Sequence, residues 1–199
     1  MKRSEINAIM RDAKQMFADY RITLPPFVLW TPEEWKTKGA EVQEIKDNML
    51  GWDVTDYGEG DFEHLGLALI TVRNGNVHNP KYTKAYAEKL IMCYPGQVSP
   101  MHYHYNKMED LINRGGNEIH FTMYNSTSME DGQLADTDVV VSMDGDQYTF
   151  PAGTEVCLKP GQSITLTPGL YHRFWGEEGK GTVLVREVSM CNDDSNDNR

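Results

Sequence analysis

Three histidines and one glutamate in this sequence have the types and spacing of a metal-binding set. His102 and His104 are separated by a single residue, so in a β-strand their side chains point to the same face. A polar turn through Asn106 would bring Glu109 back on the next strand, facing the same space. Much further along, His172 follows a turn that could start another strand. Imidazole and carboxylate ligands suit a divalent Mn, Fe, Ni, Co or Zn ion, so we expect these four residues to bind one divalent metal.

The chain around these residues has the pattern of short strands separated by turns, which predicts an all-β barrel or sandwich. Turns such as 144–145, 151–153 and 159–161 contain glycine or proline and leave no room for the helices of a parallel α/β sheet. The first long strand is expected at 65–72, closed by a hairpin-type turn at 74–76. Further strands are expected at 89–94, 119–124, 139–143, 147–150, 155–158, 163–167 and 183–190.

Helices are expected only in the first part of the chain. Apolar residues at steps of three and four predict an amphipathic helix over the first twenty residues, with Ser4 as its N-cap. The sequence Thr31-Pro32-Glu33-Glu34 predicts a second, short helix that stops near Gly39. We therefore expect a single domain over 1–199. A helical segment at 1–50 packs on a β-barrel at 51–191, and a polar tail follows at 192–199.

The composition excludes several classes of partner. There are 19 lysines and arginines against 30 aspartates and glutamates, which gives a formal net charge of -11. Nucleic acid and anionic membrane surfaces would be repelled, and the sequence shows neither a secretory signal nor a membrane span. Three cysteines, Cys93, Cys157 and Cys191, form no CxxC pair, which favours free thiols in a reducing cytoplasm.

The spacing of the candidate ligands resembles the two sequence motifs of the cupins. The first motif, G-x5-H-x-H-x4-E-x6-G, is matched by Gly96, His102, His104, Glu109 and Gly116. The second, G-x5-P-x-G-x2-H-x3-N, is matched by Gly161, Gly169 and His172. Its proline comes one place late, at Pro168, and Gly176 stands where the motif has asparagine; neither position is a ligand. The resemblance implies a cupin barrel, a double-stranded β-helix, behind the N-terminal helices.

Several segments resemble one group of cupins more closely, the D-lyxose isomerase family. They are 97–104, 107–116, the start Met1-Lys2-Arg3-Ser4, the helix entry 31–35, and the strand 186–189 followed by 192–194. The resemblance implies an aldose–ketose isomerase that interconverts D-lyxose and D-xylulose, with D-mannose and D-fructose as secondary substrates. It also implies Mn²⁺ as the metal and a homodimer. The metal would hold two adjacent sugar oxygens while a proton moves between C1 and C2 through a cis-enediol.

Three residues are candidates for the proton transfer, since metal-bound Glu109 would be partly neutralised. Glu187 shares its strand parity with Val183 and Val185, and an acid on an inward face is costly unless it is used or paired, so it is the candidate base. Lys107 either polarises a hydroxyl or shuttles a proton, or is a solvated turn lysine. Lys89, at the head of an apolar strand, touches substrate if it points inward. The base could also lie beyond Arg199.

Residues around the second motif and in the tail leave smaller questions open. Alternation places Phe174 on the same face as His172 and puts Tyr171 and Trp175 on the other face. Asp193 and Asp194 either close the mouth of the barrel or belong to a disordered tail.

Other functions remain open on sequence grounds. A metal-dependent dioxygenase would use a similar ligand set but needs an apolar pocket. The polar residues Gln97, Lys107, Asn113 and Arg114 favour a polyol instead. A non-catalytic sugar-binding cupin would bind sugar without turnover. A phosphoglucose isomerase of the archaeal type needs cations for the phosphate, which the net charge of -11 disfavours.

Overall fold

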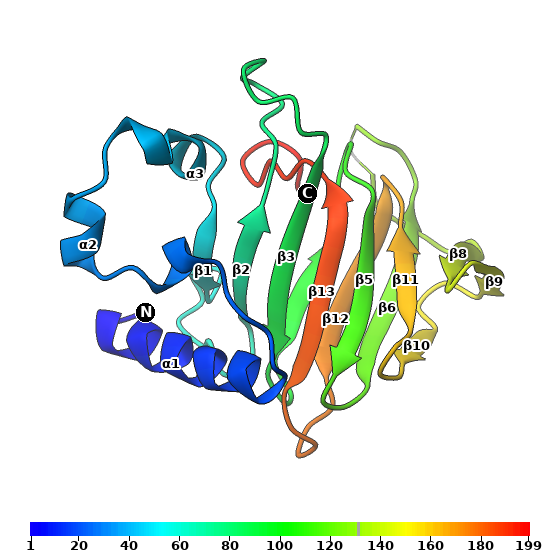
Figure 1. Ribbon diagram of the computed structural model, residues 1–199. Helices are drawn as coiled ribbons and strands as arrows, with labels where there is room; N and C mark the ends of the chain where they lie inside the picture. Colours follow the sequence, from blue (N-terminus) through cyan, green and yellow to red (C-terminus); the bar gives the residue numbers. More distant parts are fainter. Residues whose placement is uncertain (131) are drawn as a thin grey trace.

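The computed structural model describes residues 1–130 and 132–199 as antiparallel β-sheets with helices on one side (Figure 1). The helices are α1 (Arg3–Asp19), η1 (Pro26–Leu29), α2 (Pro32–Lys36), η2 (Ala40–Val42) and α3 (Gln43–Asp47). The strands of the larger sheet are, in spatial order, β1 (Gly51–Thr55), β2 (Leu67–Arg73), β3 (Tyr86–Cys93), β13 (Val183–Met190), β5 (Glu109–Gly115), β11 (Ser163–Leu166), β8 (Val139–Met143) and β9 (Asp146–Phe150). The smaller sheet has the order β10 (Glu155–Leu158), β6 (Ile119–Ser126), β12 (Leu170–Gly176) and β4 (Val98–His102), with β7 (Leu134–Ala135) paired to β6.

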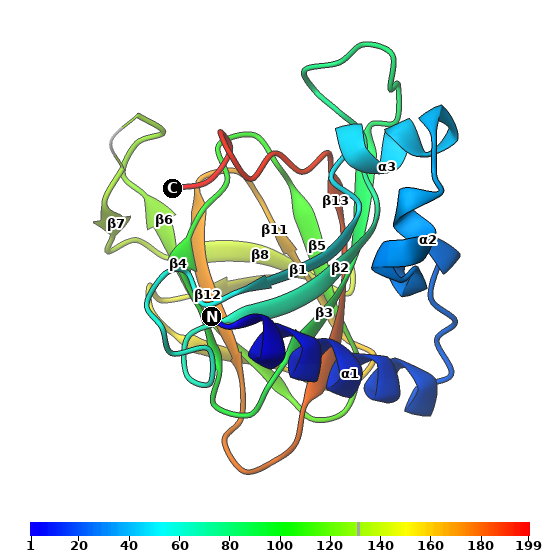
Figure 2. The same ribbon diagram turned by 90° about the vertical axis from the view of Figure 1, so that its left-hand side faces the viewer.

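The two sheets curl around a common interior, as the turned view shows (Figure 2). Both contribute apolar side chains to one buried cluster, including Ile91 and Leu111 from the larger sheet and Phe121, Met123 and Phe174 from the smaller one. This arrangement is the cupin barrel that the motif spacing predicts. The ladders between its strands are antiparallel. The all-β prediction is confirmed.

Helix α1 covers the outer face of one part of the larger sheet. Ala13 and Phe17 of α1 pack with Ile70 of β2, Met92 of β3 and Leu184 of β13 in a second buried cluster. The burial of these side chains supplies most of the stability of such a helix, because short helices are marginal by themselves.

The structure corrects one predicted helix cap and confirms the other. The N-cap predicted at Ser4 is wrong: α1 begins at Arg3, and the Lys2 amide donates to Glu5 Oε2 at 2.8 Å. At α2 the capping box is present. The Glu34 amide donates to Thr31 Oγ1 at 3.1 Å, and the Thr31 amide donates to Glu34 Oε2 at 2.7 Å.

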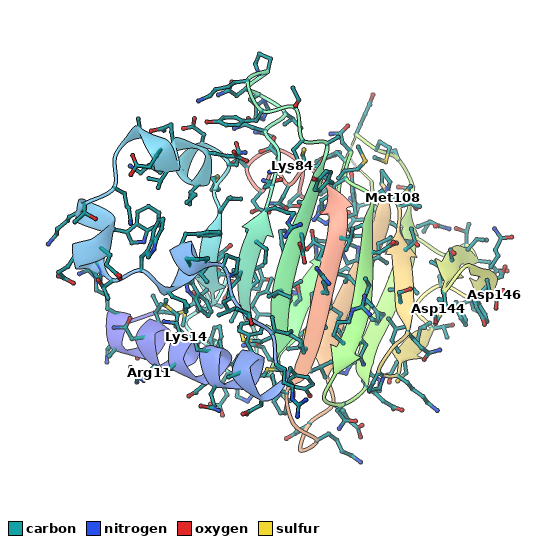
Figure 3. The ribbon with its side chains drawn as sticks, in the orientation of Figure 1. Arg11, Lys14, Lys84, Met108, Asp144 and Asp146 are labelled. Carbon is teal, nitrogen blue, oxygen red and sulfur yellow. The ribbon has the colours of Figure 1, made fainter. Side chains whose placement is uncertain are left out.

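Strand boundaries follow the sequence pattern closely, but one turn does not. Strands β8, β10 and β13 have the predicted bounds. The two-residue turn between β8 and β9 has positive φ at Asp144 and Gly145, the conformation of a type I′ hairpin (Figure 3). The tight hairpin predicted at 74–76 is wrong, because β2 ends at Arg73 and β3 begins only at Tyr86. The buried Asn74 amide instead donates to backbone carbonyls of Asn48 and Asn192 and anchors a long loop.

Two further sequence expectations concern the cysteines and the membrane. Cys93, Cys157 and Cys191 are free thiols. Within residues 1–130 and 132–199, no helix has the length and apolar character needed to cross a membrane.

Candidate metal centre

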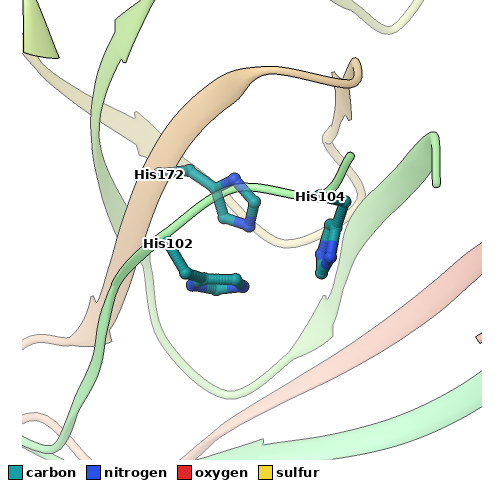
Figure 4. A group of neighbouring side chains, drawn as sticks. All are labelled: His102, His104 and His172. Atoms are coloured by element: carbon teal, nitrogen blue, oxygen red, sulfur yellow. The ribbon is translucent and has the colours of Figure 1, made fainter. Parts of the chain in front are cut away.

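Three imidazole rings converge inside the barrel (Figure 4). His102 ends β4 and lies opposite His172 on β12, with ring centroids 4.2 Å apart. His104 follows β4 by two residues, with its ring 5.2 Å from that of His102 and 5.6 Å from that of His172. One ring nitrogen from each lies within 4.8 Å of the other two. The predicted set of histidines therefore comes together from two neighbouring strands of the smaller sheet.

Backbone carbonyls orient two of these rings. His102 Nδ1 lies 2.8 Å from the Pro100 carbonyl, and His172 Nδ1 lies 2.9 Å from the Leu170 carbonyl. A carbonyl only accepts, so each Nδ1 carries a proton and Nε2 is the nitrogen available to a metal. This second hydrogen bond is the usual partner of a metal-ligating histidine.

Several ring nitrogens of this set lack a well-formed hydrogen bond. Within the described residues, Nε2 of His172 and both ring nitrogens of His104 are buried without one, although both Nε2 atoms lie near Glu109. A bound cation would relieve this costly situation. Burial, with His172 and His104 nearby, holds the pKa of His102 well below its usual range. Its ring is therefore neutral, which is the form that binds metals.

Glu109 completes the set from the opposite sheet. It begins β5, and its Oε1 lies 3.3 Å from His172 Nε2 and 3.5 Å from His104 Nε2. Burial raises the pKa of this carboxyl, but Lys107 and the two histidines outweigh that effect, so its pKa lies well below the usual value. Three imidazoles and one ionised carboxylate fit a divalent transition-metal ion.

A buried network of two lysines and a second carboxylate adjoins these residues. Lys107 Nζ lies 2.6 Å from Glu109 Oε2 and 3.1 Å from Glu187 Oε1, while Lys89 Nζ lies 3.4 Å from Glu187 Oε2. Ser189 Oγ donates to Glu187 Oε1 at 2.9 Å. Burial lowers the pKa of Lys107, but the two carboxylates raise it well above its usual value, so the side chain is an ammonium ion. Among the options left open for Lys107, the solvated turn lysine is excluded, since the residue is 3% exposed.

The register of the larger sheet explains why Lys89 meets Glu187. The two residues are direct partners across β3 and β13, and Leu111 on β5 is the partner of Glu187 on its other side. The inward orientation expected for Glu187 from strand parity is what the structure has, and Lys89 also points inward.

The C-terminal segment 192–199 lies across the open end of the barrel (Figure 2). Asp197 accepts hydrogen bonds from the backbone amides of Asn106 and Lys107 at 2.7 and 3.0 Å. Asn192 Oδ1 accepts from Lys89 Nζ at 2.7 Å. The segment predicted as a polar tail therefore holds the loop that carries Lys107, a role that its composition did not indicate.

A cavity of about 390 Å³ opens beside the metal set. Its polar lining includes all three members of the Lys89–Glu187–Lys107 network, and Leu69, Ile91 and Phe174 supply apolar walls. Asp53 and Asp194 also line it, and the sequence did not identify Asp53. Burial and the neighbouring Asp194 raise the pKa of Asp53, while Lys89 opposes the rise. Of the two acids considered for the mouth, Asp194 faces the cavity, whereas Asp193 pairs with His78 at 2.7 Å.

Several residues expected near the ligands lie elsewhere, which corrects the argument built on them. The Gln97 side chain donates to the Phe62 carbonyl, and Asn113 donates to the carbonyls of Asn117 and Leu158. Arg114 is exposed on the outer face of the barrel. Of the four polar residues taken to favour a polyol, only Lys107 lines the cavity.

The aromatic residues of β12 divide as alternation predicts. Phe174 lines the cavity. Tyr171 packs edge-on against Tyr103 at 4.7 Å, and Trp175 stacks on His120, with centroids 5.6 Å apart, on the outer face.

The comparisons with known proteins agree on one family. A family model described as D-lyxose isomerase matches residues 1–199. The chain is 48% identical over 200 residues to a D-lyxose/D-mannose isomerase of Serratia proteamaculans, covering all of this chain and 87% of the relative. It is 46% identical over 199 residues to the D-lyxose/D-mannose isomerase of Escherichia coli O157:H7, with the same coverage.

Solved structures with a similar fold include L-ribose isomerases. That of Cellulomonas parahominis with L-psicose superposes with a TM-score of 0.63 at 15% identity, covering 100% of this chain and 92% of that one. The Acinetobacter sp. DL28 mutant E204Q with L-ribose has the same TM-score and identity and covers 96% of this chain and 82% of that one. At this identity the likeness concerns the fold.

Proposed function

The chain belongs to the D-lyxose isomerase family, and on that premise we propose that this sugar isomerase interconverts D-lyxose and D-xylulose, and also D-mannose and D-fructose. The observation that carries the proposal is the junction of two groups at one cavity. His102, His104 and Glu109 line it with His172 directly behind them, and the buried Lys107–Glu187 pair lies beside them.

The metal set would hold one divalent cation, with Mn²⁺ as the proposed ion. Such a cation supplies Lewis-acid polarisation of the sugar carbonyl and of the adjacent hydroxyl. The rings of His102 and His172, oriented by their Nδ1 hydrogen bonds, the lowered pKa of His102 and the ionised Glu109 support this assignment.

Glu187 is the proposed base. It takes the proton from C2 of the aldose and returns it to C1, with a cis-enediol between the two transfers, and the reverse order operates on the ketose. Lys107 and Lys89 hold the two oxygens of this carboxylate. Because Lys107 is a cation, its proposed role is to donate a hydrogen bond to the oxygen that gains negative charge rather than to accept a proton.

The lining of the cavity disfavours the three alternatives. A sugar phosphate needs unpaired cations, but the cavity lysines in the described residues are paired with carboxylates, and Asp53 and Asp194 add negative charge. An oxygenase pocket for an apolar substrate would not carry so many ionised groups. A binding-only cupin would not require a carboxylate held between two lysines.

The test is isomerisation in D₂O by protein first stripped with chelator and then supplied with Mn²⁺. We expect the stripped protein to be inactive and the restored protein to convert D-lyxose to D-xylulose with deuterium at C1. Full activity after rigorous metal removal would contradict the metal role. Turnover without any deuterium incorporation would point to a hydride shift and remove Glu187 as the base.

We also propose a cytoplasmic homodimer, in line with the family. Its support is a group of exposed apolar side chains on adjoining strands and the loop next to them: Tyr86, Met108, Val188 and Met190. Figure 1 shows this part of the larger sheet free of the helices. Light scattering should give twice the chain mass, and replacing Val188 and Met190 by glutamate should give the monomer.

A further inference from the structure

A second group of ligand-type side chains lies on the outer face of the smaller sheet, away from the cavity. One ligand atom each from Glu118, His120 and Cys157 lies within 4.8 Å of the other two. Cys157 on β10 is the direct cross-strand partner of His120 on β6. Glu118 precedes His120 by two residues and therefore shares its face. Their neighbours Ile119 and Phe121 point into the core, so the three side chains point outward.

The His120 ring is held in one orientation. Its Nδ1 lies 2.9 Å from Glu155 Oε1, and its plane lies 18° from that of Trp175, on which it stacks. The Glu155 carboxylate accepts from Nδ1, which leaves Nε2 for another ligand. Within the described residues this buried nitrogen makes no hydrogen bond. Histidines that bind zinc usually donate from one ring nitrogen to a carboxylate while the other ring nitrogen contacts the metal.

The thiol of Cys157 contacts the Glu118 carboxylate. Its Sγ donates to Glu118 Oε2 at 3.3 Å. Burial and Glu118 raise the pKa of this thiol to about 11, with Lys159 opposing the rise, so without a metal the thiol is protonated at neutral pH. A cation that binds here would displace that proton to solvent and take the thiolate as ligand.

We propose that Glu118, His120 and Cys157 form a second metal site, which binds Zn²⁺. A thiolate, an imidazole and a carboxylate are the donors that zinc takes, and solvent can fill a fourth, tetrahedral position. Ligand bonds of about 2.0–2.3 Å place neighbouring donor atoms roughly 3.3–3.7 Å apart in a tetrahedron. The distance of 3.3 Å between Cys157 Sγ and Glu118 Oε2 already lies in this range. Bound zinc would tie the edge strand β10 to β6.

The test uses Co²⁺ as an optical probe on protein already loaded with Mn²⁺. The cavity ligands contain no sulfur, so a thiolate-to-cobalt charge-transfer band reports on cysteine ligation alone. We expect a saturable band that Zn²⁺ competes away. Cys157→Ser should abolish the band while isomerase activity is kept, which also shows that the variant is folded. Cys191→Ser, which removes another half-buried thiol, is the matched control and should keep the band.

A second variant pair tests the orienting carboxylate. Glu155→Ala should weaken cobalt and zinc affinity about 10–100-fold, as the loss of such a partner usually does. Glu155→Gln keeps an oxygen that accepts from Nδ1, so it should weaken metal affinity less than Glu155→Ala. Absence of the band in the wild-type protein, or a band that survives Cys157→Ser, overturns the proposal. Equal affinity in Glu155→Ala and the wild type contradicts the part assigned to His120.

Discussion

At the scale of single residues, the site depends on the Lys107 ammonium group, which two carboxylates share. Lys107 is 3% exposed and contacts both Glu109 and Glu187, themselves 3% exposed. Lys107→Met would leave buried Glu109 without its lysine partner and Glu187 with Lys89 alone, and breaking a buried pair in this way costs about 3–5 kcal/mol. Urea unfolding of the metal-free protein measures the loss. Adding Glu187→Gln should restore part of it, because it removes the excess negative charge of the network. A loss below about 1 kcal/mol would mean that the pair is solvated.

The same network gives a direct test of the base. Glu187→Gln keeps the shape and the hydrogen bonds to Ser189 but cannot take a proton. We expect kcat to fall about 10²–10⁴-fold, the usual contribution of a general base, with a much smaller change in KM. The matched control is Glu88→Gln. Glu88 is also buried, but it lies on the outer side of the sheet, where it pairs with Arg73 and Arg186. Equal losses in both variants would indicate a structural effect rather than catalysis.

At the scale of elements, the C-terminal segment positions the loop between β4 and β5. Asp197→Ala removes the acceptor for the Asn106 and Lys107 amides. The Lys107 amide is buried, and a buried donor left unpaired costs about 1–3 kcal/mol. We expect faster amide hydrogen exchange at 104–107 and a lower kcat/KM. Asn196→Ala changes an exposed residue of the same segment and should leave both unchanged. Unchanged exchange in Asp197→Ala would show that the loop holds its conformation without this segment.

The elements also show where sequence reasoning succeeds. Strand alternation and glycine-bounded turns predicted β8, β10 and β13 to the residue, and the parity of Glu187 predicted its inward orientation, because both signals are local. The cupin motif placed His172 with His102 because it encodes a long-range pairing as a spacing pattern.

What the sequence did not predict depends on contacts between distant segments. Nothing local distinguishes Asp197 from the other acids of a polar tail, or Asp53 from an ordinary edge-strand acid. Gln97 and Asn113 were taken as site residues because they adjoin the ligands in sequence. Their amides instead satisfy backbone carbonyls of neighbouring loops. Asparagine is common in tight turns, and Asn74 was predicted to be in one. Its buried side-chain amide instead anchors a long loop.

At the scale of the whole molecule, the charge selects against anionic substrates. The net charge is -11, and Asp53 and Asp194 face the cavity. At an effective dielectric constant near 20, an ionised carboxylate placed about 8 Å from a phosphate would contribute roughly 2 kcal/mol of repulsion before screening by salt. The raised pKa of Asp53 reduces its share. We expect kcat/KM for D-mannose 6-phosphate to be at least about 10-fold below that for D-mannose, since 1.4 kcal/mol corresponds to a factor of ten. The gap should shrink as ionic strength rises and in the double variant Asp53→Asn/Asp194→Asn, measured with both sugars. A gap that is insensitive to salt and to the double variant would mean that shape rather than charge excludes the phosphate.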